Sequence, residues 1–488
     1  MSYTRKVAFN TAAQMIGKIA GIAVSLVTTA AIFRAFGVEG VGRYTTVFAF
    51  VGFFSVFSDF GLQWTLIREL SVNKDHNKVF KNIFTFRLIL AFFVHALAFA
   101  LVWFFKYPID VKLGVGVITV AWFFTTINST LVGVFLNNYR LDITVTAEFV
   151  GRVVILAIVS LLAKYGASLN IVLFAYLAGN VTNFLINLII VRRFVEVGFA
   201  YDKKYWRYAI QQAIPIGIVL VFGFIYYKID SLMLSMMKGM TDVGIYGTAY
   251  KLLEVLQVVP SMFLGVAFPL VTKYAVTKDP RVTSAFQKQF DFLMLLAVPI
   301  VLITFMLASG IIAFIAGSKG GEFVSASTIS ILGHPATSVT CLKILIFSVG
   351  INFISNLYSY MIVSLGKQKS MVLPTILFAL LNVCLNLLLI PRLSYFGAAI
   401  ATLITEIVVS ITTYTISKQF MVLPLEFLRF GKTILAGVLT AVLIYFESKW
   451  NFNLFIVLIS AGCFYLALVI MFKAIPTDII IKLLKRES

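Results

Sequence analysis

Charged side chains interrupt several long apolar stretches of this 488-residue chain. A charge inside a bilayer costs about 3 kcal/mol or more, so it usually faces a partner, a water-filled cavity or a pathway. Cations there can bind an anionic group such as phosphate, whereas acids can take up a proton or Na⁺. The candidate substrate-binding cations are Lys18, Arg87, Arg152, Lys251 and Lys343; the candidate coupling or structural acids are Asp59, Glu148, Asp230, Glu254 and Glu406.

Depth in the membrane offers a second explanation for two of the cations. Lys18 lies one or two turns inside its apolar stretch, and Arg87 lies near the inner end of another. Long basic side chains at such positions can extend to the headgroup region instead of a cavity. Both explanations stay open for Lys18 and Arg87.

Two further cations have an acid one turn away on the same predicted helix. Arg152 follows Glu148 by four residues, and Lys251 precedes Glu254 by three. Side chains at these spacings meet on one helix face, so each pair can simply neutralise itself. Lys251 is still the leading candidate for binding an anion, because it lies too deep in its stretch to reach the headgroups easily. Lys343 is a weaker candidate on the same ground.

The acids also have two explanations. A buried carboxylate can couple transport to an ion gradient, or it can accept hydrogen bonds from the backbone or an arginine and so fix a helix end. For Asp59 and Asp230 we favour the structural explanation.

Fourteen apolar stretches carry these residues, and each is about as long as the roughly 20 residues that cross a bilayer as a helix. The sequence therefore predicts an all-α polytopic membrane protein. The predicted spans are 8–33, 42–66, 81–105, 113–136, 143–164, 168–191, 208–236, 243–271, 290–316, 338–365, 369–390, 396–417, 431–447 and 452–474.

Composition excludes several other classes of protein. The chain is 60% hydrophobic with a mean hydropathy of +0.99, which no water-soluble fold matches. The net charge of +20 does not indicate nucleic-acid binding, because Lys and Arg lie in the connectors rather than on one face. The three cysteines have no metal or redox spacing. No nucleotide-binding loop, zinc motif or catalytic triad is recognisable, so we expect a transporter without catalytic residues, metal or cofactor rather than an enzyme.

The connectors also predict the orientation of the chain. Alternate connectors, counted with the N-terminus inside, hold more than twice as many Lys and Arg residues as the others. The positive-inside rule then places both termini in the cytoplasm. The tail after residue 475 (PTDIIIKLLKRES) is expected to be a short amphipathic helix at the inner surface.

A weak internal repeat divides the chain into two halves. Gly40–Tyr44 and Asp242–Tyr246 both place Val-Gly-x-Tyr at the start of a span, and Tyr165–Ala167 is echoed at Phe396–Ala399. Because the copies are six spans apart, they predict two six-helix lobes related by an axis along the membrane normal. The predicted domains are an N-lobe (1–193), an interfacial linker (194–207), a C-lobe (208–417), and two extra helices with the tail (418–488).

Four motifs, in order along nearly the whole chain, carry a family resemblance. They are Phe36–Tyr44 (FGVEGVGRY), Ser58–Leu62 (SDFGL) followed by Arg68-Glu69, Asp230–Leu234 (DSLML) followed by Val243–Leu252 (VGIYGTAYKL), and Phe396–Thr402 (FGAAIAT) followed by Glu406. Together they resemble the O-antigen and exopolysaccharide flippases of the multidrug/oligosaccharidyl-lipid/polysaccharide exporter superfamily.

The resemblance implies a V of two six-helix lobes plus two C-terminal helices. It implies alternating access in the cytoplasmic (inner) membrane, with an undecaprenyl-pyrophosphate-linked oligosaccharide as substrate for surface polysaccharide such as the O-antigen of lipopolysaccharide. The expected partners are this glycolipid and membrane lipids, and the chain is expected to be a monomer. Na⁺ and H⁺ are the candidate coupling ions, and a polysaccharide polymerase and a chain-length regulator are the candidate protein partners.

Two other functions compete with a flippase. One is a cation-coupled exporter of drugs from the same superfamily. A cationic cavity suits an anionic substrate better than it suits a cationic drug. The other is a membrane polysaccharide polymerase or glycosyltransferase, which needs a sizeable outer catalytic loop. The longest expected outer connector, 317–337, is either an ordered loop or a short helix, and its only acid is Glu322.

Overall fold

The computed structural model describes the backbone of residues 3–450 and 452–474, and side chains from residue 17 onward. The chain forms two compact units. Unit 1 runs to Gly247 and adds Ala316–Glu322 and Asn382–Ser394, and unit 2 holds the other described residues. The predicted lobe boundaries at residues 193 and 417 stay a prediction.

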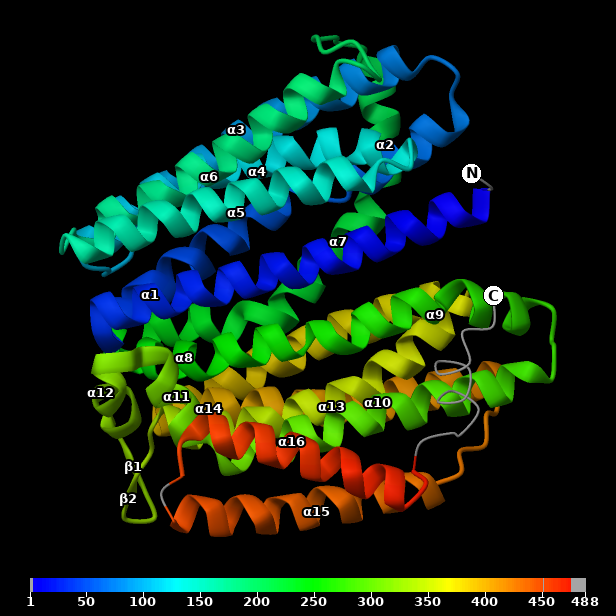
Figure 1. Cartoon of the computed structure of the whole chain (residues 1–488). Helices are drawn as coiled ribbons and strands as arrows, with labels where there is room; N and C mark the ends of the chain where they lie inside the picture. Colours follow the sequence, from blue (N-terminus) through cyan, green and yellow to red (C-terminus); the bar gives the residue numbers. More distant parts are fainter. Residues whose placement is uncertain (1–2, 451, 475–488) are drawn as a thin grey trace. The chain divides into compact units, whose positions relative to one another are not determined.

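Helices make up almost all of the described chain (Figure 1). Unit 1 contains α1 (Tyr3–Asp59), α2 (Leu62–Val72), α3 (His76–Leu101), η1 (Val102–Phe104), α4 (Ile109–Asn137), α5 (Leu141–Lys164), α6 (Leu169–Val191), α7 (Lys203–Met237) and η2 (Gly317–Lys319). Unit 2 contains α9 (Val258–Val276), α10 (Arg281–Met306), β1 (Ser330–Ile331), β2 (His334–Pro335), α13 (Ser338–Ser364), η3 (Gln368–Met371), α15 (Leu428–Lys449) and α16 (Leu454–Met471). The units share α8 (Met240–Leu256), α11 (Ala308–Ala316), α12 (Gly320–Ser325) and α14 (Val372–Phe420).

Twelve helical segments of the described residues are long and apolar enough to cross a membrane. Two of them, Gly17–Val72 and Gln368–Phe420, have 56 and 53 residues. A helix of ~55 residues is about 80 Å long, more than twice the ~30 Å of hydrocarbon. The helix α1 in the first segment is kinked at Gly37, and α14 in the second is kinked at Ser394; both residues have non-helical dihedrals. Counting each as two crossings gives fourteen, which confirms the predicted all-α polytopic fold.

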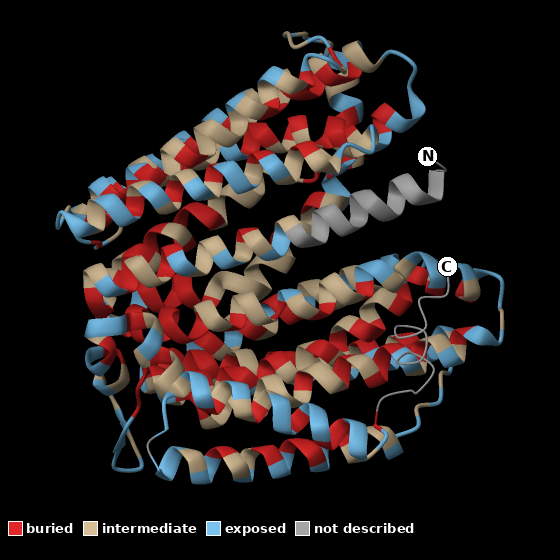
Figure 2. Cartoon of the chain, viewed as in Figure 1, coloured by how far each residue is buried: buried red, intermediate tan, exposed pale blue. Residues whose placement is uncertain are grey.

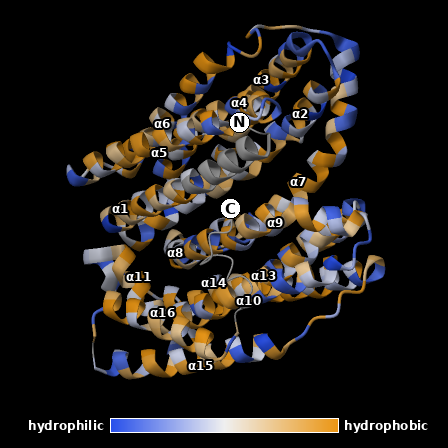
Figure 3. Cartoon of the chain, turned by 45° about the vertical axis from the view of Figure 1, so that its right-hand side comes forward, coloured by the Kyte–Doolittle hydropathy of each residue, from blue (hydrophilic) through white to orange (hydrophobic). Residues whose placement is uncertain are grey.

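The outward faces of the helices are apolar. Figure 3 shows hydrophobic residues along the helices and hydrophilic ones gathered in the connecting segments. Large apolar side chains such as Phe93 and Ile459 are about two-thirds exposed, at 64% and 67%. Such a surface is stable in lipid and not in water, so the chain is a multi-pass membrane protein. Its predicted orientation stays a prediction, and the predicted tail helix lies outside the described residues.

In unit 1, α4, α5 and α6 pack closely together, and α1 packs on α4, α5 and α7. Figure 2 shows that buried residues follow the facing sides of these helices. One core cluster joins Phe50 of α1 with Val115 and Ile118 of α4 and Leu173 of α6. These apolar seams hold the helices that carry the polar residues described below.

Two Val-Gly-x-Tyr motifs form a tight backbone crossing between α1 and α8. An ideal Cβ on Gly42 would lie 1.7 Å from the carbonyl oxygen of Met240, and one on Gly244 would lie 1.9 Å from the carbonyl oxygen of Val38. Only glycine allows such an approach. The repeat found in the sequence therefore marks two helices that cross each other at their glycines.

The turn expected between the first two spans is a sharp kink in α1. Gly37 has φ +66°, a region that favours glycine. The backbone groups released by the kink are bound from the segment after α11: Glu322 Oε1 accepts from the Val38 N–H at 2.8 Å, and Lys319 Nζ donates to the Ala35 carbonyl at 2.9 Å. We call Lys319 and Glu322 the kink clip.

Removing the kink clip is expected to destabilise the protein. Glu322→Leu or Lys319→Leu leaves a partly buried backbone group without its partner, which costs about 1–3 kcal/mol for each group. Thermal unfolding of the purified protein in detergent measures the loss. Glu322→Gln is the matched control, because its amide oxygen can still accept from Val38; a loss as large as that of Glu322→Leu would argue against the hydrogen bond as the cause.

Unit 2 is organised around α10, which packs on α13, α15 and α9, while α15 packs on α16. The outer connector predicted as a loop or short helix contains the six-residue α12 and also a small antiparallel hairpin, which the sequence did not predict. Tyr395 at the α14 kink donates its hydroxyl to the Ala336 carbonyl at 2.7 Å, which anchors the end of that hairpin.

Candidate functional site

A break in the second span sets the position of Asp59. The sequence predicted one helix over 42–66, but α1 ends at Asp59 and α2 begins at Leu62. Phe60 and Gly61 have φ of +36° and +80°. An ideal Cβ on Gly61 would lie 2.9 Å from the Ala213 carbonyl, so glycine also allows α7 to approach. The predicted span lies within the apolar segment Gly17–Val72, but its helix is broken here, and Asp59 stands at a helix end within unit 1.

Arg87 of α3 binds Asp59. One guanidinium nitrogen, Nη2, forms an ion pair with Asp59 Oδ1, and Arg87 is only 1% exposed. Its Nε and Nη1 are buried and have no hydrogen-bond partner among the described residues. Extension to the headgroups, one of the two explanations for Arg87, is therefore wrong. A guanidinium has five N–H donors, and most of those of Arg87 are unused. It is therefore suited to donate to a further anionic or polar partner.

A pocket of about 550 Å³ lies beside this pair, within unit 1. Asp59 and Arg87 are the charged residues of its lining, and three aromatic side chains and several hydroxyls complete the wall. The lining residues are Ser55, Val56, Asp59, Gln63, Arg87, Trp122, Thr125, Thr126, Ser129, Val219, Leu220, Gly223, Phe224 and Tyr227. Its volume falls within the range of about 300–1,000 Å³ for small-molecule sites.

The predicted Glu148–Arg152 pair is present on α5. Arg152 Nη2 binds Glu148 Oε1, and Arg152 Nη1 donates to Ser25 Oγ of α1 at 3.0 Å. Arg152 also lies close to Gly21, whose ideal Cβ would be 3.3 Å from Nη1. Lys18 lies one turn before Gly21 on α1 and is exposed. Arg152 thus links two helices of unit 1, and Lys18 keeps both of its explanations.

In unit 2, Lys251 and Glu254 also form the pair that their spacing allows. Lys251 Nζ lies 3.0 Å from Glu254 Oε2, with about a third of the lysine side chain exposed. Lys343 is half-buried, and its Nζ lies 5.2 Å from the centre of the Phe305 ring, a cation–π contact. Neutralisation within the pair and contact with a ligand remain compatible for Lys251, because about a third of its side chain is exposed.

The other two acids are buried. The Asp230 carboxylate accepts from the backbone N–H of Ser231 at 2.7 Å and from the Tyr246 hydroxyl. This arrangement agrees with the structural explanation. Glu406 of α14 is 2% exposed, and Asn352 Nδ2 of α13 lies 3.4 Å from its Oε1. Asn352 also accepts from Asn356 at 2.7 Å. These two asparagines were not among the predicted site residues, although two amides four residues apart in an apolar stretch were a usable signal.

A family model described as "Polysaccharide biosynthesis protein" matches residues 3–275. No curated protein sequence matches the chain.

Several solved structures share the fold. A lipid II flippase, MurJ, in an inward closed conformation matches with a TM-score of 0.77 and 12% identity over 95% of this chain and 98% of that one. An inward-facing multidrug resistance MATE transporter of the MOP superfamily has a TM-score of 0.65 and 11% identity, over 82% and 95% of the two chains. A MOP superfamily transporter from Pyrococcus furiosus matches with a TM-score of 0.58 and 12% identity, over 85% of this chain and 96% of that one. At these identities the likeness shows the fold.

Proposed function

Because the chain belongs to the family of polysaccharide biosynthesis proteins, we propose that it is a flippase for lipid-linked oligosaccharide. It carries an undecaprenyl-pyrophosphate-linked glycan from the inner to the outer leaflet of the cytoplasmic membrane by alternating access, for surface polysaccharide synthesis. The fold it shares with a lipid II flippase supports this reading. The observation that carries the proposal is Arg87, a buried cation with unused donors at the wall of a pocket inside unit 1.

The chemistry of the substrate explains why such a cation is needed. A pyrophosphate that leaves water loses strong hydration, and charge-assisted hydrogen bonds from a guanidinium replace it. The hydroxyls of Thr125 and Ser129 line the same pocket but donate to the Ala121 and Thr126 carbonyls, so Arg87 is the donor to the pyrophosphate in this proposal. In this proposal Arg87 binds the pyrophosphate, and Asp59 holds the guanidinium in place until substrate arrives.

The shared fold with a MATE transporter keeps drug export as the second candidate. A cationic drug needs a carboxylate in the pocket. The carboxylate that lines the pocket, Asp59, is already paired with Arg87. The two charges cancel, so this pocket attracts a cation poorly, and Arg87 still offers donors to an anion. This observation favours the flippase.

Transport in liposomes tests the proposal directly. The purified full chain is reconstituted with a fluorescent undecaprenyl-pyrophosphate-linked sugar, and a membrane-impermeant reagent reports how much glycan reaches the outside. We expect the inner pool to become accessible without ATP, and empty liposomes to retain it. An absolute need for ATP, or export of a cationic dye with no movement of the glycolipid, would contradict the proposal.

Lys251 gives a second, independent expectation. A desolvated contact with a charged group contributes about 1.5–3 kcal/mol, so Lys251→Ala should weaken substrate binding roughly ten- to a hundredfold. The variant should insert normally but fail to restore surface polysaccharide in a flippase-deficient strain, and Lys251→Arg should keep part of the activity. The control is Lys251→Ala combined with Glu254→Gln. If that double variant regains activity, Lys251 only neutralises Glu254.

A further inference from the structure

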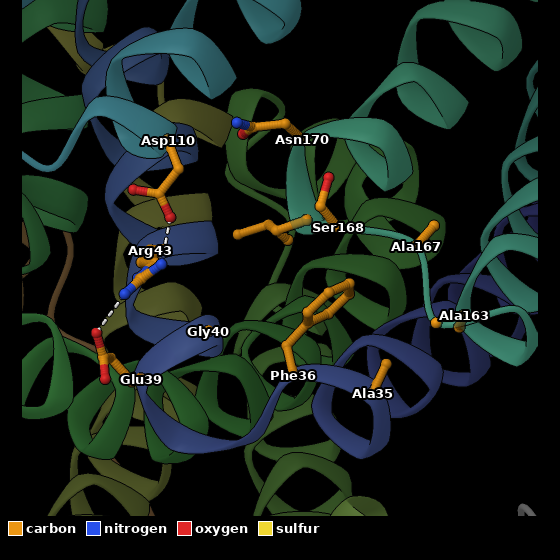
Figure 4. Close-up of a pocket in the computed structure, with 12 residues that line it drawn as sticks. Ala35, Phe36, Glu39, Gly40, Arg43, Asp110, Ala163, Ala167, Ser168 and Asn170 are labelled. Carbon is orange, nitrogen blue, oxygen red and sulfur yellow. Dashed lines mark hydrogen bonds and ion pairs between the residues drawn. The ribbon is translucent and has the colours of Figure 1, made fainter.

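A second pocket, of about 510 Å³, lies in unit 1 and is lined by residues of α1, α4, α5 and α6. Its walls come from α1 just around the kink, from the first turn of α4, and from the α5–α6 connector with the start of α6. Figure 4 shows Phe36, Glu39, Arg43, Asp110, Ser168 and Asn170 gathered around it. The charge distribution of the connectors predicts that all three segments lie on the outer side.

The polar groups of this pocket converge on Arg43. Its guanidinium is held between two carboxylates, Glu39 at 2.5 Å on one side and Asp110 on the other. Within the described part of the chain, Arg43 Nε is nevertheless buried without a hydrogen-bond partner, and so is the side-chain oxygen of Asn170. A fixed arginine, two acids and an amide therefore present both donors and acceptors to one space.

The charges decide which chemistry fits. Glu39, Arg43 and Asp110 are the charged residues of the lining and carry a net charge of −1. An anionic group such as pyrophosphate is repelled by the two carboxylates, and a cation meets Arg43. An uncharged ligand rich in hydroxyls fits best, because each hydroxyl both donates to a carboxylate and accepts from a guanidinium or amide.

The Phe36 ring adds an apolar surface to this polar set. It lines the pocket and is directed towards the side of Ser168 (Figure 4). A sugar ring has hydroxyls at its rim and C–H groups on its faces, so it matches an aromatic face bordered by planar polar side chains. We propose that this pocket is a carbohydrate-binding site for an uncharged sugar unit of the glycan on the outer side of the membrane. The identity of the glycan rests on the proposed function, but the binding chemistry does not.

A binding experiment with lipid-free sugar tests the site. The probe is the free oligosaccharide released by mild acid from the lipid-linked pool of the native host, and the protein is the full chain in phospholipid nanodiscs. Titration calorimetry or ligand-observed NMR gives the dissociation constant. We expect Phe36→Leu to weaken binding about three- to tenfold, because it removes the ring and keeps an apolar side chain. Asn170→Leu removes the buried amide and should weaken binding by a similar factor.

Phe92→Leu is the matched control, since Phe92 of α3 is 59% exposed and does not line this pocket. It should bind the oligosaccharide as the unchanged chain does, and inorganic pyrophosphate should not compete. Melting temperatures show whether each variant is folded. If one of the two pocket variants unfolds, binding to the other tests the proposal. No binding to the unchanged chain, equal binding to the folded pocket variants, or competition by pyrophosphate would each overturn the proposal.

The liposome assay separates this inference from the proposed function. If the unchanged chain moves the glycolipid but does not bind the free oligosaccharide, only the carbohydrate site is wrong. If it binds the oligosaccharide through Phe36 and Asn170 but does not move the glycolipid, the flippase proposal fails and the carbohydrate site stands.

Discussion

Arg87→Gln is expected to lower glycolipid transport by roughly a hundredfold and to destabilise the protein. The substitution removes the cation proposed to bind the pyrophosphate, and charge-assisted hydrogen bonds of this kind contribute about 1.5–3 kcal/mol each. It also leaves Asp59 without its partner; because this carboxylate is 26% exposed, the loss of stability should stay below the ~3–5 kcal/mol of a fully buried pair. Complementation of a flippase-deficient strain measures transport, and thermal unfolding in detergent measures stability.

The double variant Asp59→Asn with Arg87→Gln separates the two effects. Both side chains keep their approximate size and lose their charge, so the double variant should recover most of the stability lost in Arg87→Gln. It should remain inactive, because the pyrophosphate still lacks its cation. Arg87→Lys should keep partial activity, since a point charge replaces the guanidinium fork. Recovery of transport in the double variant would falsify a substrate role for Arg87 and leave the pair a purely structural one.

Gly42→Ala and Gly244→Ala are expected to unfold the protein or lower its melting temperature by several degrees. Each added methyl group would overlap a backbone carbonyl of the crossing helix, which has no rotamer to escape into. Overpacking of side chains alone costs about 1–3 kcal/mol, and a backbone clash should reach the upper end of this range or exceed it. Thermal unfolding in detergent, with expression level in the membrane as a second readout, measures the effect.

Gly265→Ala and Gly462→Ala are the matched controls. Both glycines lie inside helices, and apart from the local helix backbone no described atom lies within 4 Å of the methyl group that alanine would add. Glycine in a helix costs about 0.5–1 kcal/mol relative to alanine, so these two changes should be neutral or slightly stabilising. The crossing is not the cause if all four variants lose the same amount of stability.

Features that depend on local spacing were predictable from the sequence. The fourteen crossings follow from the length and polarity of each stretch. Two ion pairs, Glu148–Arg152 and Lys251–Glu254, follow from helical periodicity, since residues three or four apart share a helix face. The roles of these side chains stay predictions, because spacing does not decide whether a pair also faces substrate.

Features that depend on a single backbone conformation or on distant residues were not predictable. Hydropathy averaged over a span does not detect two residues with positive φ, so the break at Phe60 and Gly61 was missed. The partner of Arg87 lies 28 residues earlier on another helix, and nothing in the sequence says how the two helices are rotated toward each other. The same limit hid the pocket around Arg43, whose three walls meet only in the folded unit.

The kink clip has a consequence for the order in which the chain matures. The backbone of α1 at Gly37 depends on Lys319 and Glu322, which follow the groups they bind by 284 residues. At a synthesis rate of about 5–20 residues per second, the ribosome needs about 15–60 s to produce them. During that interval the nascent first hairpin of the membrane domain lacks the partners of its bend. The bend in α1 is therefore completed only when about two thirds of the chain has been translated and inserted, so the N-terminal helices wait for a segment made much later.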